Sequence, residues 1–190
     1  MVSTDKLMHF LVGLVIGVLF WQMLKRWAPG STRRINPGLF LVMVVWGASG
    51  LFLFRKLGIP LLSADWVYMA VPDWDIPLYK LTQWRFLIHR SWLFHSTLIP
   101  TALIWLSVWQ LGQRSHRAWK WILDGAMGLS VGMATHLVWD TLASKRGFVV
   151  HGWNAGGSLL WLIASLVAGF GIPWLIAWAI HRPSSLDTSG

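Results

Sequence analysis

Cysteine and glutamate are both absent from this chain of 190 residues. Without cysteine the protein can form no disulfide, no thiolate metal site and no cysteine nucleophile. Every acidic residue is an aspartate, and seven aspartates stand against sixteen lysines and arginines, for a formal net charge of +9. Charged residues make up 12% of the chain, whereas soluble domains typically carry about 25%. This shortage of charge argues against a large soluble domain.

Apolar residues make up 55% of the chain and occur in long blocks. A helix that spans a bilayer needs about 20 mainly apolar residues. Five segments approach this length, at roughly 7–24, 38–54, 92–111, 121–143 and 158–180. Many of the sixteen tryptophans lie near the ends of these segments, as in the aromatic belts of membrane proteins. We therefore predict an all-α, polytopic integral membrane bundle of about five transmembrane helices.

The connection 55–91 is the longest segment between two predicted spans. Its apolar part, IPLLSADWVYMAV, is too short to cross a bilayer, which favours a re-entrant or interfacial segment. We predict a single membrane-embedded domain over residues 1–182, followed by a polar and disordered tail over 183–190.

The predicted spans divide the loops between two faces of the membrane. If the N-terminus lies on side B, the loops 25–37 and 112–120 lie on side A, and 55–91 and 144–157 lie on side B. Lysine and arginine are equally numerous on the two sides, so the positive-inside rule does not choose an orientation. If Arg90 belongs to a site, side A is the cytoplasmic face and side B the extracytoplasmic one. The excess of positive charge fits loops near anionic lipid, and without a basic stripe we expect no nucleic-acid partner.

Histidine and aspartate from four separate parts of the chain are expected together on side B. They are His9 in the first span, Asp73 and Asp75 in the connection, His89 and His95 around the start of the third span, and His136 and Asp140 near the end of the fourth. Ionisable groups at membrane depth are costly and usually functional. Nitrogen and oxygen ligands without sulfur suit zinc, with manganese and iron as alternatives. We therefore predict a shared divalent-metal site.

The spacing within each pair suggests how it would serve a metal. His136 and Asp140 are four residues apart, so on a helix they project from one side. Asp73 and Asp75 are two residues apart and can serve neighbouring ions or bridge them. His89 is expected to precede the third span, and His95 to lie one turn inside it.

Other histidines and aspartates have simpler interpretations. Either HxxxD or DxD alone is a weak signal, since aspartate is also common in turns. We expect Asp65, Asp124 and His151 to be structural groups or outer neighbours of the site. His116 and His181 fall on side A and are expected to be solvated.

Four motifs together resemble a known family. MHFLVG, VPDWDIP, HRSWLFHS and HLVWDTLASKRG, within residues 8–147, resemble the membrane-bound, metal-dependent hydrolases of the YdjM type, also labelled LexA-binding inner-membrane-associated hydrolases. The resemblance implies that the seven histidines and aspartates are the metal-site positions and that the protein lies in a bacterial inner membrane. That family's distant similarity to zinc-dependent phospholipase C implies phosphoester hydrolysis. Tryptophan inside three motifs, at Trp74, Trp92 and Trp139, departs from the pattern and leaves the substrate open.

These features predict a metal-dependent hydrolase that acts on a lipid or lipid-linked phosphoester at the membrane surface. Asp73 or Asp75 would orient or deprotonate the attacking water. Arg90 would clamp a phosphate oxygen with its planar guanidinium, unless it extends to the interface instead. Ser96 would hydrogen-bond a ligand or the leaving oxygen.

Two non-enzymatic alternatives use the same residue types. A haem protein would ligate iron with histidines such as His95 and His136, but this leaves the aspartates unexplained. A transporter or proton relay would use intramembrane histidine and aspartate, but it predicts polar groups spread through the depth of the bilayer.

Overall fold

The computed structural model of the protein describes residues 4–29, 34–52, 55, 65–113, 117–143 and 148–181. In these ranges all regular structure is helical, so the all-α prediction is confirmed for them. The α-helices are α1 (Thr4–Trp27), α3 (Pro37–Ser49), α5 (Asp75–Thr82), α6 (Leu98–Gln113), α7 (Arg117–Ala143) and α8 (Ala155–His181). Three short 3-10 helices, Asp65–Tyr68, Val71–Trp74 and Arg85–Leu87, lie between α3 and α6.

Some predicted features lie outside the described ranges. They are residues 59–64 of the apolar part of the connection, the polar tail 183–190, His116, and the side chains of Asp65 and His181.

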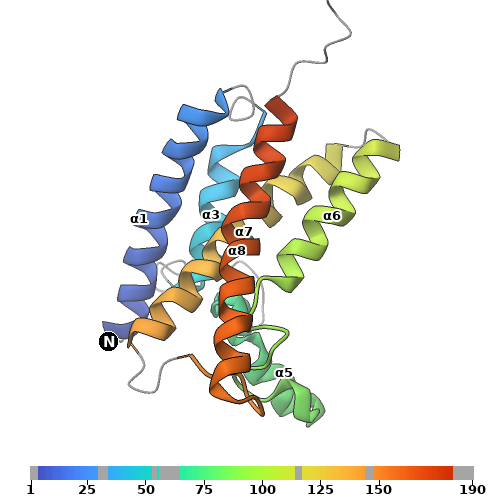
Figure 1. The fold of residues 1–190 in the computed structure, drawn as a ribbon. Coiled ribbons are helices and arrows are strands. Elements are labelled where there is room, and N and C mark those ends of the chain that lie inside the picture. The colour runs from blue at the N-terminus through green and yellow to red at the C-terminus, as the bar shows by residue number, and fades with distance from the viewer. Residues whose placement is uncertain are drawn as a thin grey trace, which may run out of the picture.

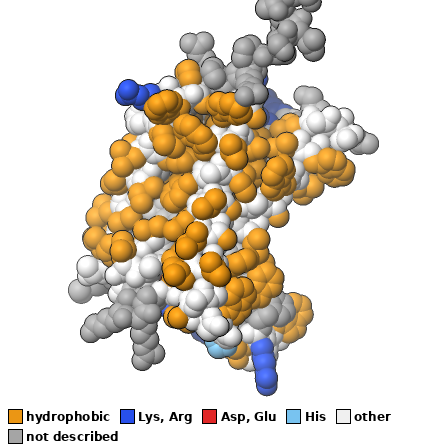
Figure 2. All heavy atoms as spheres, viewed as in Figure 1, with side chains coloured by type: hydrophobic (Ala, Val, Ile, Leu, Met, Phe, Trp, Pro, Cys, Tyr) orange, Lys and Arg blue, Asp and Glu red, His pale blue; other side chains and the backbone are white. Residues whose placement is uncertain are grey.

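Within the described chain, α1 and α8 are the two helices long and apolar enough to cross a membrane. The α3 helix is apolar but has 13 residues, which rise about 20 Å against a hydrocarbon core of about 30 Å. A five-span arrangement therefore stays a prediction. Large apolar side chains on the outer surface agree with a membrane environment, and in Figure 2 they cover most of the face that α1 and α8 form.

Helix α7 is the centre of the bundle. Every residue from Leu123 to Leu137 is buried, and α7 contacts α1, α3, α6 and α8, which surround it in Figure 1. A helix buried on all sides belongs to the core of a bundle. Because α7 runs from one end of the bundle to the other, it places His136 and Asp140 beside the start of α1.

Glycine allows the helices around α7 to approach closely. A Cβ atom on Gly128 or Gly132 would overlap the backbone of α3, and one on Gly13 would overlap Ala48. Gly13 and Gly17, like Gly128 and Gly132, form the GxxxG pattern of closely packed membrane helices. The three helices α1, α3 and α7 therefore form a tight unit, and two of them carry site residues.

Residues 65–97, between α3 and α6, cover one end of this unit. Gly50, with a φ of +79°, ends α3 where the backbone of residues 68–70 packs directly against it. This contact holds the following short helix, Val71–Trp74, against α3 and α7, and α5 continues directly from that helix. The elements that carry Asp73 and Asp75 thereby lie at the end of the bundle where α1 begins and α7 ends (Figure 1).

Candidate metal centre

The structure brings the seven predicted histidines and aspartates together at this end of the bundle. They form two adjoining groups, His9 with His136 and Asp140, and Asp73 with His89 and His95, while Asp75 lies behind the second group. In each group the ligand atoms lie within 4.8 Å of one another. Buried histidine and aspartate in such groups could hold a metal ion.

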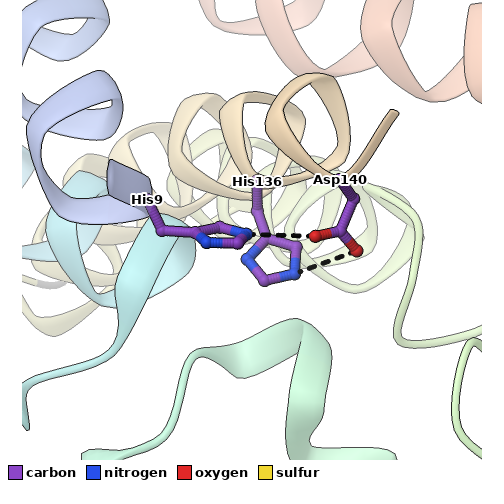
Figure 3. Close-up of side chains that lie close together, drawn as sticks. All are labelled: His9, His136 and Asp140. Carbon is purple, nitrogen blue, oxygen red and sulfur yellow. Dashed lines mark hydrogen bonds and ion pairs between the residues drawn. The ribbon is translucent and has the colours of Figure 1, made fainter. Parts of the chain in front are cut away.

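The first group joins α1 to α7, as Figure 3 shows. The Nε2 atom of His9 lies 3.0 Å from Oδ1 of Asp140, and Nε2 of His136 lies 3.6 Å from Oδ2 of the same carboxylate. The two imidazole rings are 4.4 Å apart between centroids. Asp140 is thus shared by histidines from two helices.

Backbone carbonyl groups fix how both imidazoles of this group are protonated. Nδ1 of His9 lies 3.0 Å from the carbonyl oxygen of Asp5, and Nδ1 of His136 lies 2.8 Å from that of Ala48. Because a carbonyl only accepts, both Nδ1 atoms donate, which leaves each Nε2 as the nitrogen available to the Asp140 carboxylate or to a metal ion. Metal-binding histidines commonly donate their other nitrogen in this way. Both Nε2 atoms therefore face Asp140 as potential ligands.

The second group lies between α5 and α6. Asp75, the first residue of α5, is fully buried, and its Oδ2 atom accepts from the Ser91 backbone N–H at 3.1 Å. The same oxygen lies 3.3 Å from Nδ1 of His95, and Oδ1 lies 3.4 Å from Nδ1 of His89. The Asp75 carboxylate thus orients both histidines, as an outer neighbour of a metal does.

The charge state of Asp75 follows from these contacts. Burial raises its pKa, but the neighbouring imidazoles of His89 and His95 and the N–H of Ser91 outweigh burial and lower the pKa to about 2. The Asp75 carboxylate in turn raises the pKa of His89. Asp75 is therefore an ionised hydrogen-bond acceptor at neutral pH.

His95 lies between the two groups, and its ring nitrogens make no hydrogen bond with the described residues. Its Nε2 atom lies 3.8 Å from Oδ2 of Asp140, and its ring centroid lies 5.9 Å from that of His136. Both nitrogens of His95 and Nε2 of His136 are buried without a hydrogen bond from the described residues. A buried polar atom left unpaired is costly. Since Nδ1 of His95 faces Asp75, the Nε2 atoms of His95 and His136 are the ones that fit a metal ion that accepts a lone pair.

A cavity of about 280 Å³ opens beside the two groups. His9 and His136 line it from one group, and Asp73 and His89 line it from the other. Lys6, which the sequence analysis did not single out, also lines this space from the first turn of α1. The cavity therefore opens onto potential ligands of both groups.

Arg90 and Ser96 occupy turns next to the second group. Arg90 is half-buried with a φ of +66°, and its carbonyl accepts from the backbone N–H of His151 at 3.0 Å. The Ser96 hydroxyl is buried, donates to the Leu93 carbonyl at 2.9 Å and accepts from the Leu98 N–H at 3.2 Å. These two hydrogen bonds hold Ser96 at the start of α6. A contact with substrate stays a prediction for Arg90 and for Ser96.

The three motif tryptophans have different surroundings. Trp74 packs edge-on against Trp46 and Trp66. Trp92 is 40% exposed, and Trp139 donates from its indole to the Asp5 carboxylate at 3.2 Å. This hydrogen bond places Trp139 over the first turn of α1, the helix that carries His9.

Two residues considered as outer neighbours of the site do not line its cavity. Asp124 lies near the other end of α7, where its carboxylate pairs with Lys120 at 2.6 Å and accepts from the Asn36 N–H at 3.0 Å. This makes it a structural group. His151 is exposed.

No family model, curated protein or solved structure matches this chain. The YdjM-type resemblance accordingly stays an expectation from the motifs.

Proposed function

We propose that this protein is a membrane-bound, metal-dependent hydrolase that cleaves a phosphoester of a lipid or lipid-linked substrate at the membrane surface. The observation that carries the proposal is the pair of adjoining His and Asp groups beside a cavity of about 280 Å³, with buried imidazole nitrogens that find no hydrogen-bond partner among the described residues. Such nitrogens are poorly explained by structural packing alone.

The two groups supply the metal ligands. His9, His136 and Asp140 would hold one ion, and Asp73, His89 and His95 would hold a second. Zinc, with manganese or iron as alternatives, supplies the Lewis acidity that activates water and polarises a phosphoryl oxygen.

The two aspartates of VPDWDIP have different roles in this proposal. Asp75 is fully buried, and both of its oxygens face the Ser91 N–H or the imidazoles of His89 and His95. It therefore orients those rings. Asp73 is only partly buried and lines the cavity, so its carboxylate is the one placed to take up a proton from the attacking water.

The surroundings of the cavity favour an anionic group on a lipid. Lys6 lines the cavity, and Arg90 lies beside His89 in the same turn. A phosphate would be attracted by both cations. The cavity also lies at the end of the bundle where α1 and α8, the helices of membrane-crossing length, begin. A substrate held in the bilayer would present its head group at this level.

Metal analysis and hydrolysis assays test the proposal together. Purified wild-type protein is expected to hold stoichiometric transition metal, measured by inductively coupled plasma mass spectrometry. It is also expected to hydrolyse bis-p-nitrophenyl phosphate, or phosphatidic acid in mixed micelles. Asp75→Ala and His95→Ala are expected to lose both properties. His151→Ala changes an exposed histidine and is expected to keep both.

Several results would contradict the proposal. Wild-type protein without bound transition metal, or variants that retain it unchanged, would refute the metal centre. Bound metal without phosphoesterase activity would refute the reaction only. A Soret band in the purified protein would favour the haem alternative.

A further inference from the structure

An open apolar groove runs between α1 and α8, away from the His and Asp cluster. Its volume is about 550 Å³. Leu19 and Met23 line it from α1, and Gly171 and Trp174 line it from α8. The other lining residues are also apolar. The groove lies between the two helices that can cross a bilayer, so in a membrane it faces the hydrocarbon.

A cation of α1 and two tryptophans of α8 lie at one end of the groove. Leu19, Met23 and Arg26 are spaced by four and three residues, which places them on one face of α1. Arg26 is exposed in the last turn of α1. Trp178 follows Trp174 by one turn and is also exposed. A basic and aromatic rim therefore borders the groove at the level where lipid head groups lie.

This rim lies at the opposite end of α1 from the metal ligands. Met23 follows His9 by fourteen residues, which corresponds to about 21 Å along a helix. The groove is thus separate from the candidate metal centre, and its occupant does not depend on the proposed reaction.

The side chains of the groove favour a flexible chain over another helix. Membrane helices that associate closely use small residues at their contact. In this protein the small faces at Gly13 and Gly132 are already packed inside the bundle. The groove instead is lined by bulky side chains, with Gly171 as the one small lining residue. A Cβ atom added to Gly171 would meet nothing within 4 Å.

We propose that the groove binds an anionic phospholipid, with one acyl chain between α1 and α8 and the phosphate beside Arg26. The apolar lining matches the acyl chain. The guanidinium of Arg26 matches the phosphate, for which arginine offers a planar pair of donors. Trp174 and Trp178 lie where the head group meets the hydrocarbon.

Photolabelling in vesicles tests this site. The probes are phosphatidylglycerol and phosphatidylcholine, each with a diazirine in one acyl chain, in vesicles of those two lipids. Mass spectrometry is expected to find the phosphatidylglycerol label concentrated on residues 16–23 and 170–174, above the level on the exposed Trp105 and Trp109 of α6.

Matched variants separate the groove from its rim. Gly171→Leu fills the groove and is expected to reduce labelling there to the α6 level. Gly112→Leu, on α6, also adds a side chain into open space and is expected to leave the labelling unchanged. Arg26→Gln is expected to weaken phosphatidylglycerol labelling about fivefold and to leave phosphatidylcholine labelling as it was. Lys80→Gln is the charge control, because Lys80 is an exposed cation of α5, and it is expected to leave the phosphatidylglycerol labelling of the groove unchanged.

Uniform labelling of all exposed apolar faces would overturn the proposal. So would equal effects of Gly171→Leu and Gly112→Leu, or crosslinking of two copies of the chain through the groove in place of lipid. Size-exclusion chromatography checks that each variant is folded. If Gly171→Leu fails this check, Leu19→Trp fills the groove from α1, where Leu19 is exposed.

Discussion

Replacing Gly132 with alanine should damage both the packing of the bundle and the metal centre. The new Cβ would lie 2.9 Å from the carbonyl carbon of Val44, and closer still to its oxygen. Carbon atoms in contact are about 3.5–4.0 Å apart, so α3 and α7 must separate locally by at least about 0.6 Å. Backbone atoms of a packed helix yield less easily than a side chain. Overpacking of this kind costs about 1–3 kcal/mol in free energy of unfolding.

The same displacement reaches the metal ligands one turn further along. His136 follows Gly132 by four residues and Ala48 follows Val44 by four, so the two pairs lie on the same faces of α7 and α3. The hydrogen bond from Nδ1 of His136 to the Ala48 carbonyl is 2.8 Å long. An added 0.6 Å stretches it to about 3.4 Å, beyond the usual range of N–H···O bonds. Loss of such an orienting contact typically weakens metal affinity by about 10- to 100-fold.

Thermal unfolding and metal competition measure these two effects. Gly132→Ala should have a lower Tm than wild type. After both proteins are loaded with zinc, a chelating dye should remove the metal from the variant at a lower dye concentration. Gly125→Ala is the matched control on the same helix, since its Cβ would approach the Met43 Cγ at an ordinary 3.6 Å. The control should be neutral or up to about 1 kcal/mol more stable through helix propensity. Equal Tm and metal affinity in the two variants would refute the reasoning.

Two further predictions concern the opposite end of α7 and the metal itself. Lys120→Met removes the cation that pairs with buried Asp124, so unfolding free energy should fall by about 1–3 kcal/mol. Metal content should not change, because Asp124 precedes His136 by twelve residues, about 18 Å along the helix. An unchanged Tm of Lys120→Met would show that the ion pair between Lys120 and Asp124 adds no stability. Chelation should lower the Tm of wild-type protein, and zinc at about 100 times its Kd should restore about 2.7 kcal/mol. If neither chelation nor added zinc changes the Tm of the wild-type protein, His95 and His136 do not hold an ion.

The gathering of the histidines and aspartates at one end was predictable because helices are rigid and alternate in direction. The order of apolar segments predicts that His9, the connection 55–91 and the end of the segment 121–143 share a side, and the structure places them together. The four-residue spacing of His136 and Asp140 likewise predicts one helical face. The GxxxG patterns at Gly13 and Gly128 were a further signal of close packing, which the sequence analysis did not use.

Other features of the site depend on contacts that no residue type encodes. The carbonyl groups of Asp5 and Ala48 that orient His9 and His136 are backbone atoms, and every residue carries one. Their role depends on how closely α1 and α3 approach α7.

The sequence by itself determined an all-helical chain rich in apolar blocks and the residue types that can ligate a metal. The tertiary structure decided which of these residues share an ion and which support the others. Asp73 and Asp75 show the difference, since they are two residues apart in one motif. Only the fold buries Asp75 against Ser91 and His95 while it leaves Asp73 at the cavity. Burial and hydrogen bonding depend on neighbours distant in the chain, and these set the role of a carboxylate.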